Sequence, residues 1–301
     1  MNHIHKSLGH FLMFICTNLL IGIDYNTNNC FAADLTKYDI EEYSEGEKMV
    51  MDIKKYAISK QTSEKTIVLW DCDNVLQMNR DHAFREPNIQ KILAKIPKAR
   101  WVNVIWKSKK IIVEKWILDC TQDLDKSGVN QFVFTQCSSD SGTRHNRKLV
   151  LKKLGYNFFY NAVKLADDEF NNDEFNNGEF NISQKSLQLR LGQEQTTKPV
   201  YEDGIIYTGS ASKGRTITEF FKLLNKADIK DFNVIFIDDK RKNIDEVKEA
   251  CKAFGIKKFH GLNYTFAKHN TTQLTQGEID LYIKLLTPEN ERTLRNVIDI
   301  L

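Results

Sequence analysis

The sequence predicts an α/β fold: a doubly wound parallel sheet with a largely helical segment inserted between its first and second strands. Short runs of β-branched, aliphatic and aromatic residues predict buried strands, namely TIVLW, QFVFT, GIIYT and NVIFI. Helical patterns of about 12 to 15 residues alternate with these runs, as in a parallel sheet covered by helices on both faces. A length of 301 residues, 41% of them hydrophobic, suits one large domain with an inserted subdomain.

In chain order, the elements begin with a polar N-terminal helical extension at residues 34–64. TIVLW is then the first strand, and EPNIQKILAKI predicts a helix with a proline near its start. SKKIIVEKWILDCTQDL predicts a second helix, and QFVFT the next strand. GTRHNRKLVLKKLGY predicts a helix that ends at Gly155.

The second half continues the alternation after an irregular segment. GIIYT and NVIFIDD predict strands, each followed by a helix: SKGRTITEFFKLLNKA and then RKNIDEVKEACKAFG, which ends at Gly255. KKFHGLNYT predicts one more strand, and helices follow over 266–301. The core is therefore expected at 65–76 and 129–265, with the largely helical insertion at 77–128.

Residues 165–200 break the pattern with the repeat DEFNN, DEFNN, GEFN. A five-residue period is too short for a solenoid unit. A calcium loop is the alternative, but the spacing lacks the glycine and terminal glutamate of an EF-hand. We therefore expect an exposed, disordered insertion.

The N-terminus predicts export. MNHIHK, the apolar LGHFLMFICTNLLIGI and the small-residue CFAAD have the order of a secretory signal peptide over residues 1–33. The alternative is an uncleaved anchor, which would be the protein's one link to a membrane. The expected location is periplasmic or secreted.

Charge bears on the binding partners of the protein, and the cysteine count on its disulfides. A formal charge of +3 with scattered lysines does not indicate a nucleic-acid partner. After removal of the signal peptide, four cysteines remain, at positions 72, 120, 137 and 251. We expect free, buried thiols, with a Cys120–Cys137 disulfide as the alternative.

Polar side chains gather where the predicted strands end. Asp71 and Asp73 follow TIVLW, Thr135 ends QFVFT, Lys213 begins the helix after GIIYTGSAS, and Asp238 and Asp239 end NVIFIDD. In a parallel sheet these positions converge on one crevice. Facing carboxylates need a divalent cation, and hard oxygen ligands favour Mg²⁺. Lys213 and the Thr135 hydroxyl would suit a bound phosphoryl group.

This ordered set resembles the haloacid dehalogenase superfamily, mostly phosphatases and other phosphoryl-transfer enzymes. DCDNV looks like its first motif, Thr135 its second, Lys213 its third, and the pair Asp238–Asp239 its fourth. More narrowly, GIIYTGSASKGRTITEFF, NVIFIDDKRKNIDEV and FHGLNYT look similar to an uncharacterised bacterial domain family of exported proteins within that superfamily. The sequence departs from that pattern with TQC after the second strand.

The resemblance implies a Mg²⁺-dependent phosphatase with a covalent intermediate, and a helical cap over the active site at residues 77–128. Asp71 would be the nucleophile and Asp73 the general acid and base. Mg²⁺ would be held by Asp71, the Asp73 backbone carbonyl and Asp238, with water between it and Asp239. The substrate would be a small phosphate ester or a phosphorylated host target. A non-catalytic binding module and a phosphotransferase or mutase remain as alternatives.

Other polar residues have a functional and a structural interpretation. Five cap residues either contact the substrate or form solvated charges and cap core: Arg80, His82, Arg85, Trp101 and Trp106. Asn243 either orients the second acidic pair or lies in the first turn of its helix. Ser138 and Ser139 either donate to phosphate or cap the next helix. His145 and His260 are either bases or residues of a surface helix and a strand edge.

Overall fold

A computed structural model describes residues 38–58, 63–96, 108–158, 179–180, 198–224 and 229–286. The predicted signal peptide, Trp101 and Trp106 lie outside these residues, as do most of the predicted insertion and the last part of the C-terminal segment. Within them, no helix has the length and apolar character that a membrane span requires.

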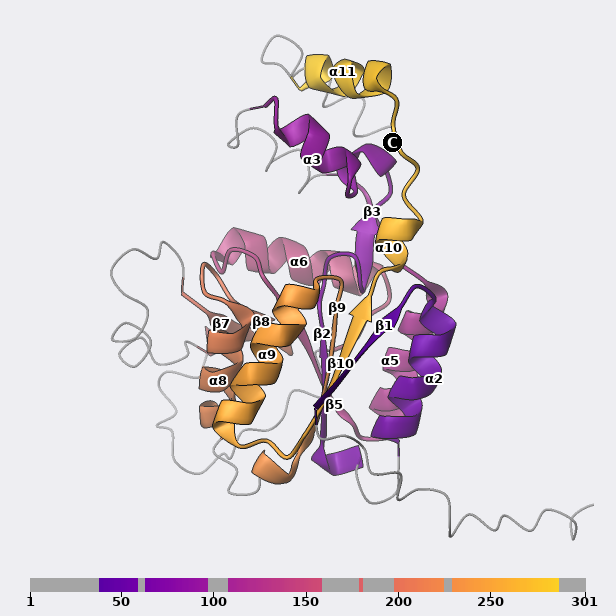
Figure 1. The fold of residues 1–301 in the computed structure, drawn as a ribbon. Coiled ribbons are helices and arrows are strands. Elements are labelled where there is room, and N and C mark those ends of the chain that lie inside the picture. The colour runs from indigo at the N-terminus through magenta and orange to yellow at the C-terminus, as the bar shows by residue number, and fades with distance from the viewer. Residues whose placement is uncertain are drawn as a thin grey trace, which may run out of the picture. The chain divides into compact units, whose positions relative to one another are not determined.

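The architecture is α/β, with a mostly parallel sheet (Figure 1). The sheet order within the described residues is β1-β10-β9-β2-β5-β8-β7-β6. Its strands are β1 (Tyr38–Tyr43), β2 (Thr66–Trp70), β5 (Asn130–Thr135), β6 (Glu179–Phe180), β7 (Val200–Glu202), β8 (Ile205–Tyr207), β9 (Asn233–Asp238) and β10 (Lys258–Tyr264). In this order, each strand from the β1 edge as far as β8 is parallel to its neighbour. β7 runs antiparallel to both β8 and β6.

Helices cover both faces of this sheet, as the sequence predicts (Figure 1). One face packs on α2 (Gly46–Ala57), α5 (Lys115–Lys126) and α6 (Ser141–Lys153), and the other on α8 (Lys213–Leu223) and α9 (Arg241–Phe254). The alternation along β2 shows the reason: Val68 and Trp70 enter the first core cluster, Ile67 and Leu69 the second. A strand buried on both sides has no polar face, so its sequence reads as a continuous apolar run.

The first strand of the sheet differs from the sequence prediction. Residues 34–64 were expected to form a helical extension before the sheet, but Tyr38–Tyr43 form β1, which pairs in parallel with β10 along its whole length. Helix α2 then begins at Gly46 and follows the prediction. The acidic sequence YDIEEY obscures the strand because β1 lies at the sheet edge, where charged side chains are common.

The segment predicted as a helical cap, 77–128, is more mixed than expected. It contains an antiparallel pair, β3 (Gln77–Asn79) and β4 (Lys110–Ile112), and the helix α3 (Asn88–Leu93). The prediction of one helix over 108–124 is wrong, because β4 occupies its first part and α5 its second. Helix α5 places Ile117, Cys120 and Leu124 in the first core cluster, so it packs on the sheet.

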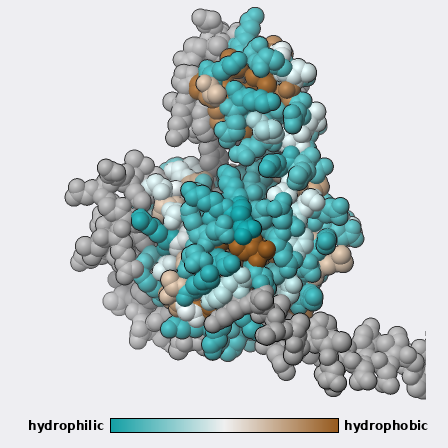
Figure 2. All heavy atoms as spheres, viewed as in Figure 1, coloured by the Kyte–Doolittle hydropathy of each residue, from teal (hydrophilic) through white to brown (hydrophobic). Residues whose placement is uncertain are grey.

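The C-terminal region forms α10 (Phe266–His269) and α11 (Gln276–Leu285), in agreement with the expected helices. α11 packs against α3 through a third apolar cluster that includes Ile92 and Ile279. Hydrophobic residues of this region are visible between hydrophilic ones in Figure 2. Two segments far apart in sequence therefore build one small subdomain.

Candidate active site

Asp71 lies at the carboxyl end of β2, in the middle of the sheet. Its backbone N–H donates to the carbonyl of Ile237 at 2.8 Å, which ties the start of the loop to β9. Its buried side chain accepts a hydrogen bond from Lys213 Nζ at 2.5 Å. The nucleophile predicted from sequence thus points at the lysine predicted to accompany it.

Lys213 is fully buried at the start of α8. Its Nζ lies between Asp71 and Asp238, at 2.6 Å from the second. The rings of Phe134 and Phe236 lie 5.3 and 5.1 Å from the same atom, where a cation is attracted to an aromatic face. A cation at a helix N-terminus opposes the helix dipole, so the two carboxylates account for its placement.

Asp238 ends β9 and has no solvent exposure. Besides Lys213, it accepts hydrogen bonds from the Lys240 backbone N–H at 2.8 Å and from Asn243 Nδ2 at 3.0 and 3.1 Å. Asn243 therefore lies in the first turn of α9 and also orients one member of the acidic pair, Asp238. The carboxylate is fixed on several sides before any ligand binds.

Asp239 is held by a residue that the sequence analysis did not identify. Asn74 has a φ of +66°, a left-handed conformation that asparagine tolerates, and its Nδ2 donates to Asp239 at 2.8 Å. Burial raises the pKa of Asp239 to about 6, against the hydrogen bond from Asn74 and with the help of the nearby Asp238 charge.

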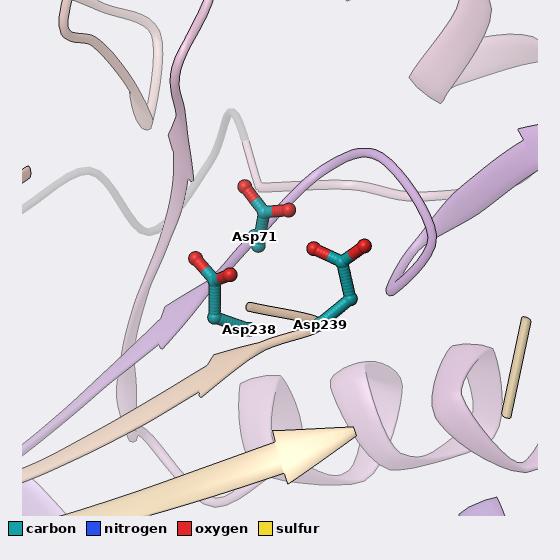
Figure 3. A group of neighbouring side chains, drawn as sticks. All are labelled: Asp71, Asp238 and Asp239. Atoms are coloured by element: carbon teal, nitrogen blue, oxygen red, sulfur yellow. The ribbon is translucent and has the colours of Figure 1, made fainter. Parts of the chain in front are cut away.

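Asp71, Asp238 and Asp239 bring one carboxylate oxygen each to within 4.8 Å of one another. Figure 3 shows the three side chains projecting from the ends of β2 and β9 toward the same space. With all three acids ionised, the carboxylates and the Lys213 ammonium would sum to a charge of about −2. This charge is costly without a cation, since burial raises the pKa of Asp71 well above its usual value despite Lys213. Hard oxygen donors with this excess charge fit a divalent cation such as Mg²⁺.

The Asp73 side chain lies outside this group of three acids. Arg147 of α6 donates to both of its oxygens, from Nη1 to Oδ1 at 2.7 Å and from Nη2 to Oδ2 at 2.9 Å. Gln77 Nε2 donates to Oδ1 at 2.9 Å. Partial desolvation raises the pKa of the half-exposed Asp73, but the charge and hydrogen bonds of Arg147 outweigh it and hold this pKa well below its usual value.

Thr135 is buried at the end of β5, the strand that neighbours β2. Its carbonyl accepts the Thr208 N–H at 3.1 Å, and its hydroxyl hydrogen-bonds with the Cys137 thiol. Thr135 thus lies at the carboxyl end of a strand next to β2, as the sequence predicts. Its contact with phosphate stays a prediction.

Two cap residues considered as substrate contacts have structural partners. The Arg85 guanidinium donates to the backbone carbonyls of Asn79, Arg80 and Asn270. His82 Nδ1 accepts the backbone N–H of Thr272 at 2.9 Å. Both side chains join 79–85 to the chain before α11, which favours the structural interpretation.

The remaining alternatives are also resolved in part. Asp140, rather than Ser138 or Ser139, caps α6 by accepting the Thr143 N–H at 2.9 Å. His145 is exposed on α6, as the surface-helix interpretation expected. His260 is buried in β10, between β1 and β9, so its assignment to a strand edge is wrong because β1 covers it.

The cysteines are free, as predicted: Cys72, Cys120 and Cys251 are buried, and Cys137 is partly so. The Cys120–Cys137 disulfide is therefore absent among the described residues.

Arg147 is the main site residue that sequence reasoning missed. The signal was present in the helix after QFVFT, because Arg144, Arg147 and Leu151 recur at spacings of three and four residues. These residues form the buried stripe of α6. Arginines on a buried stripe need acidic partners, and the helix follows a strand that ends at the site.

Comparison with known proteins places the chain in a family. No curated protein and no solved structure matches the chain. A family model matches residues 47–286, a range that includes Asp71, Lys213, Asp238 and Asp239. The chain therefore belongs to the family described as Protein of unknown function (DUF2608).

Proposed function

We propose that the protein is a Mg²⁺-dependent phosphatase of the haloacid dehalogenase type, acting on phosphoric monoesters through an aspartyl-phosphate. The observation that carries the proposal is the buried group of Asp71, Asp238 and Asp239 with Lys213 bonded to two of them. This group combines a carboxylate nucleophile, oxygen ligands for a cation and a fixed positive charge. Phosphoryl transfer is accelerated mainly by such positioning and charge stabilisation.

In the first step, an Asp71 oxygen attacks phosphorus and the bond to the ester oxygen breaks. The leaving oxygen takes a proton from Asp73, and the phosphoryl group stays on Asp71. Lys213 lies next to Asp71, where its charge would stabilise the transferring group. Bound Mg²⁺ would be held by Asp71, Asp238 and the Asp73 carbonyl, with Asp239 close by, and would supply further positive charge.

In the second step, Asp73 takes a proton from water, whose oxygen attacks phosphorus. The bond to Asp71 then breaks, which regenerates its carboxylate and releases phosphate. Arg147 favours the ionised form of Asp73, the form that accepts this proton, and disfavours the protonated form that donates in the first step. Thr135 is proposed as a further phosphate contact, from its place at the end of β5.

The test is hydrolysis of an aryl phosphate by the protein with and without Mg²⁺, beside the variants Asp71→Asn and Asp231→Asn. Asn is nearly isosteric with Asp but is not a nucleophile, so Asp71→Asn should reduce turnover to about one hundredth or less. Asp231 is exposed and pairs with Lys257, so Asp231→Asn should keep the wild-type rate.

Other results would select another function. Mg²⁺ binding by folded protein without hydrolysis favours a phosphotransferase or mutase, in which a second substrate accepts the phosphoryl group. If the folded protein neither binds Mg²⁺ nor hydrolyses the aryl phosphate, the proposal is contradicted. That result favours a non-catalytic binding module.

We further propose that the protein is exported and that its substrate lies outside the cytoplasm, as a small phosphate ester or a phosphorylated host target. This rests on the order of charged, apolar and small residues in the first 33 positions. Mass spectrometry of the N-terminus after expression in a bacterium with an outer membrane would test it: a chain beginning near residue 34 in the periplasmic fraction is the expected result.

A further inference from the structure

Arg147 and Asp73 form a two-point ion pair in which the two members differ in exposure. The Arg147 side chain is 4% exposed, whereas that of Asp73 is 54% exposed. Two parallel N–H to O bonds, at 2.7 and 2.9 Å, fix the plane of the carboxylate as well as its position. Asp73 is thus clamped from the protein side, while its other side stays open to solvent.

The backbone around Asp73 is restrained as well. The Asn74 N–H donates to the Gln77 carbonyl at 2.7 Å, and the Gln77 side chain bonds to Asp73. Without the arginine, the Asp73 side chain would keep the Gln77 bond to Oδ1, and rotation about its χ angles would be less restrained. The arginine supplies the other two bonds, including the one to Oδ2.

A second arginine on the same helix provides a comparison. Arg144, three residues earlier on α6, is also buried and bonds to Glu202 of β7 at 2.6 Å. That pair joins a helix to a hairpin of the sheet and lies among structural contacts. Arg147 instead reaches the loop that carries Asp71 and Asp73. Since a buried ion pair is weak evidence for a gain in stability, orientation of Asp73 is the better account of this arginine.

We propose that Arg147 is a positioning residue that orients the Asp73 carboxylate for proton transfer. This proposal rests on the phosphatase function proposed above. Arg147 acts through Asp73 and does not contact the substrate. Its removal therefore lowers kcat, because proton transfer loses its geometry, and leaves KM and Mg²⁺ affinity nearly unchanged.

A double-mutant cycle on kcat tests this. Asp73→Asn should lower kcat by about a hundredfold or more, and Arg147→Met by about tenfold to a hundredfold. The double variant should be about as active as Asp73→Asn alone, because an arginine that acts through Asp73 has nothing left to position. Arg147→Lys keeps the charge but loses the two-point contact, so its loss should lie between wild type and Arg147→Met.

Arg144→Met is the matched control, since it removes a buried, paired arginine from the same helix. It should keep the wild-type kcat in the presence of Asp73, unlike Arg147→Met, and should leave the kcat of Asp73→Asn unchanged when the two are combined. If the kcat loss of Arg147→Met multiplies with that of Asp73→Asn, or if Arg147→Met raises KM as much as it lowers kcat, the positioning role is overturned while phosphatase activity stands. If wild type and Asp71→Asn are equally inactive, the proposed function fails and this role fails with it.

Crystal structures provide a readout that does not depend on activity. In Arg147→Met, the Asp73 side chain should occupy more than one rotamer, with Asp71 and Asp238 unmoved. A single, unchanged Asp73 rotamer in that variant would overturn the proposal even if kcat falls. Unfolding curves of each variant identify any that does not fold, and Arg147→Lys then replaces Arg147→Met in the cycle.

Discussion

At the scale of single residues, the burial of the Lys213 ammonium is energetically costly. It is a fully buried cation with two buried carboxylates as partners. A buried ion costs several kcal/mol of solvation, which only close partners recover. The site and the stability of the fold are therefore coupled at this residue.

We predict that Lys213→Met lowers the free energy of unfolding by about 3–5 kcal/mol, because Asp71 and Asp238 would keep their buried charges without a partner. Urea unfolding in the presence of a chelator measures the loss. Lys222→Met is the control on the same helix, since Lys222 is 39% exposed, and it should change stability by no more than about 0.5 kcal/mol. Equal losses of stability in the two variants would show that the contribution of Lys213 to stability does not come from its burial.

His260 gives the fold a pH dependence that is separate from the site. Burial lowers its pKa below the usual 6.5, against the acidic neighbours and with the help of Lys55. The ring of Tyr56 lies 4.1 Å from that of His260. The charged groups that face it come from β1 and α2: Glu41, Asp39, Asp52 and Lys55.

Because the unfolded chain binds this proton more readily, the stability that neutral His260 contributes is present above about pH 6.5 and is lost as the pH falls below it. We predict that His260→Leu loses less stability than wild type between about pH 7 and pH 5, as urea unfolding would measure. The exposed His145 is the control: His145→Leu should keep the wild-type pH dependence.

At the scale of elements, the close approach of α8 and α9 supports the site, because α8 begins with Lys213 and α9 contains Asn243. Gly214 allows this approach: a Cβ added there would lie 2.7 Å from the carbonyl oxygen of Glu246 on α9. A methyl group in that space would force the two helices apart and shift Lys213.

Gly214→Ala should therefore destabilise the protein by about 1–3 kcal/mol, despite the better helix propensity of alanine. Gly277→Ala in α11 is the matched control, because an added Cβ there meets nothing within 4 Å. It should stabilise by up to about 1 kcal/mol. Thermal unfolding of both variants compares them, and stabilisation by Gly214→Ala would contradict the close packing.

At the scale of the whole described chain, the buried apolar residues form three clusters. Two lie on opposite faces of the sheet, and the third joins α3 to α11. The third shares no buried residue with the other two, so it can open without removing apolar contacts from the sheet.

We predict that Ile279→Asp separates α3 from α11 while the sheet stays folded, because Ile279 is 2% exposed and an unpaired carboxylate there is costly. Hydrogen exchange should lose protection at 88–93 and keep it in β2 and β9. Leu281→Asp on the same helix is the control, since Leu281 is 55% exposed. Loss of protection in all three segments would show that the clusters unfold together.

Local sequence patterns predicted the central strands and most helices. β2, β5 and β9 are buried on both faces, so their apolar runs are distinctive, and Gly255 ends α9 with a φ of +88° as its position predicts. The hairpin β7–β8 was missed, although its Asp203–Gly204 turn, with φ values of +48° and +76°, has a recognised sequence signal.

The sequence by itself determined which acids stand at strand ends and which lysine begins the helix after a strand, because strand periodicity and parallel topology are local and general rules. Only the tertiary structure decided that β1 closes the sheet edge, that α3 packs on α11, and that Asp73 is bonded to Arg147. These features join residues between 74 and 221 positions apart. The buried stripe of α6 indicates that Arg147 needs an acidic partner, but not which one. The partner, like the other two features, depends on burial and charge pairing across the fold.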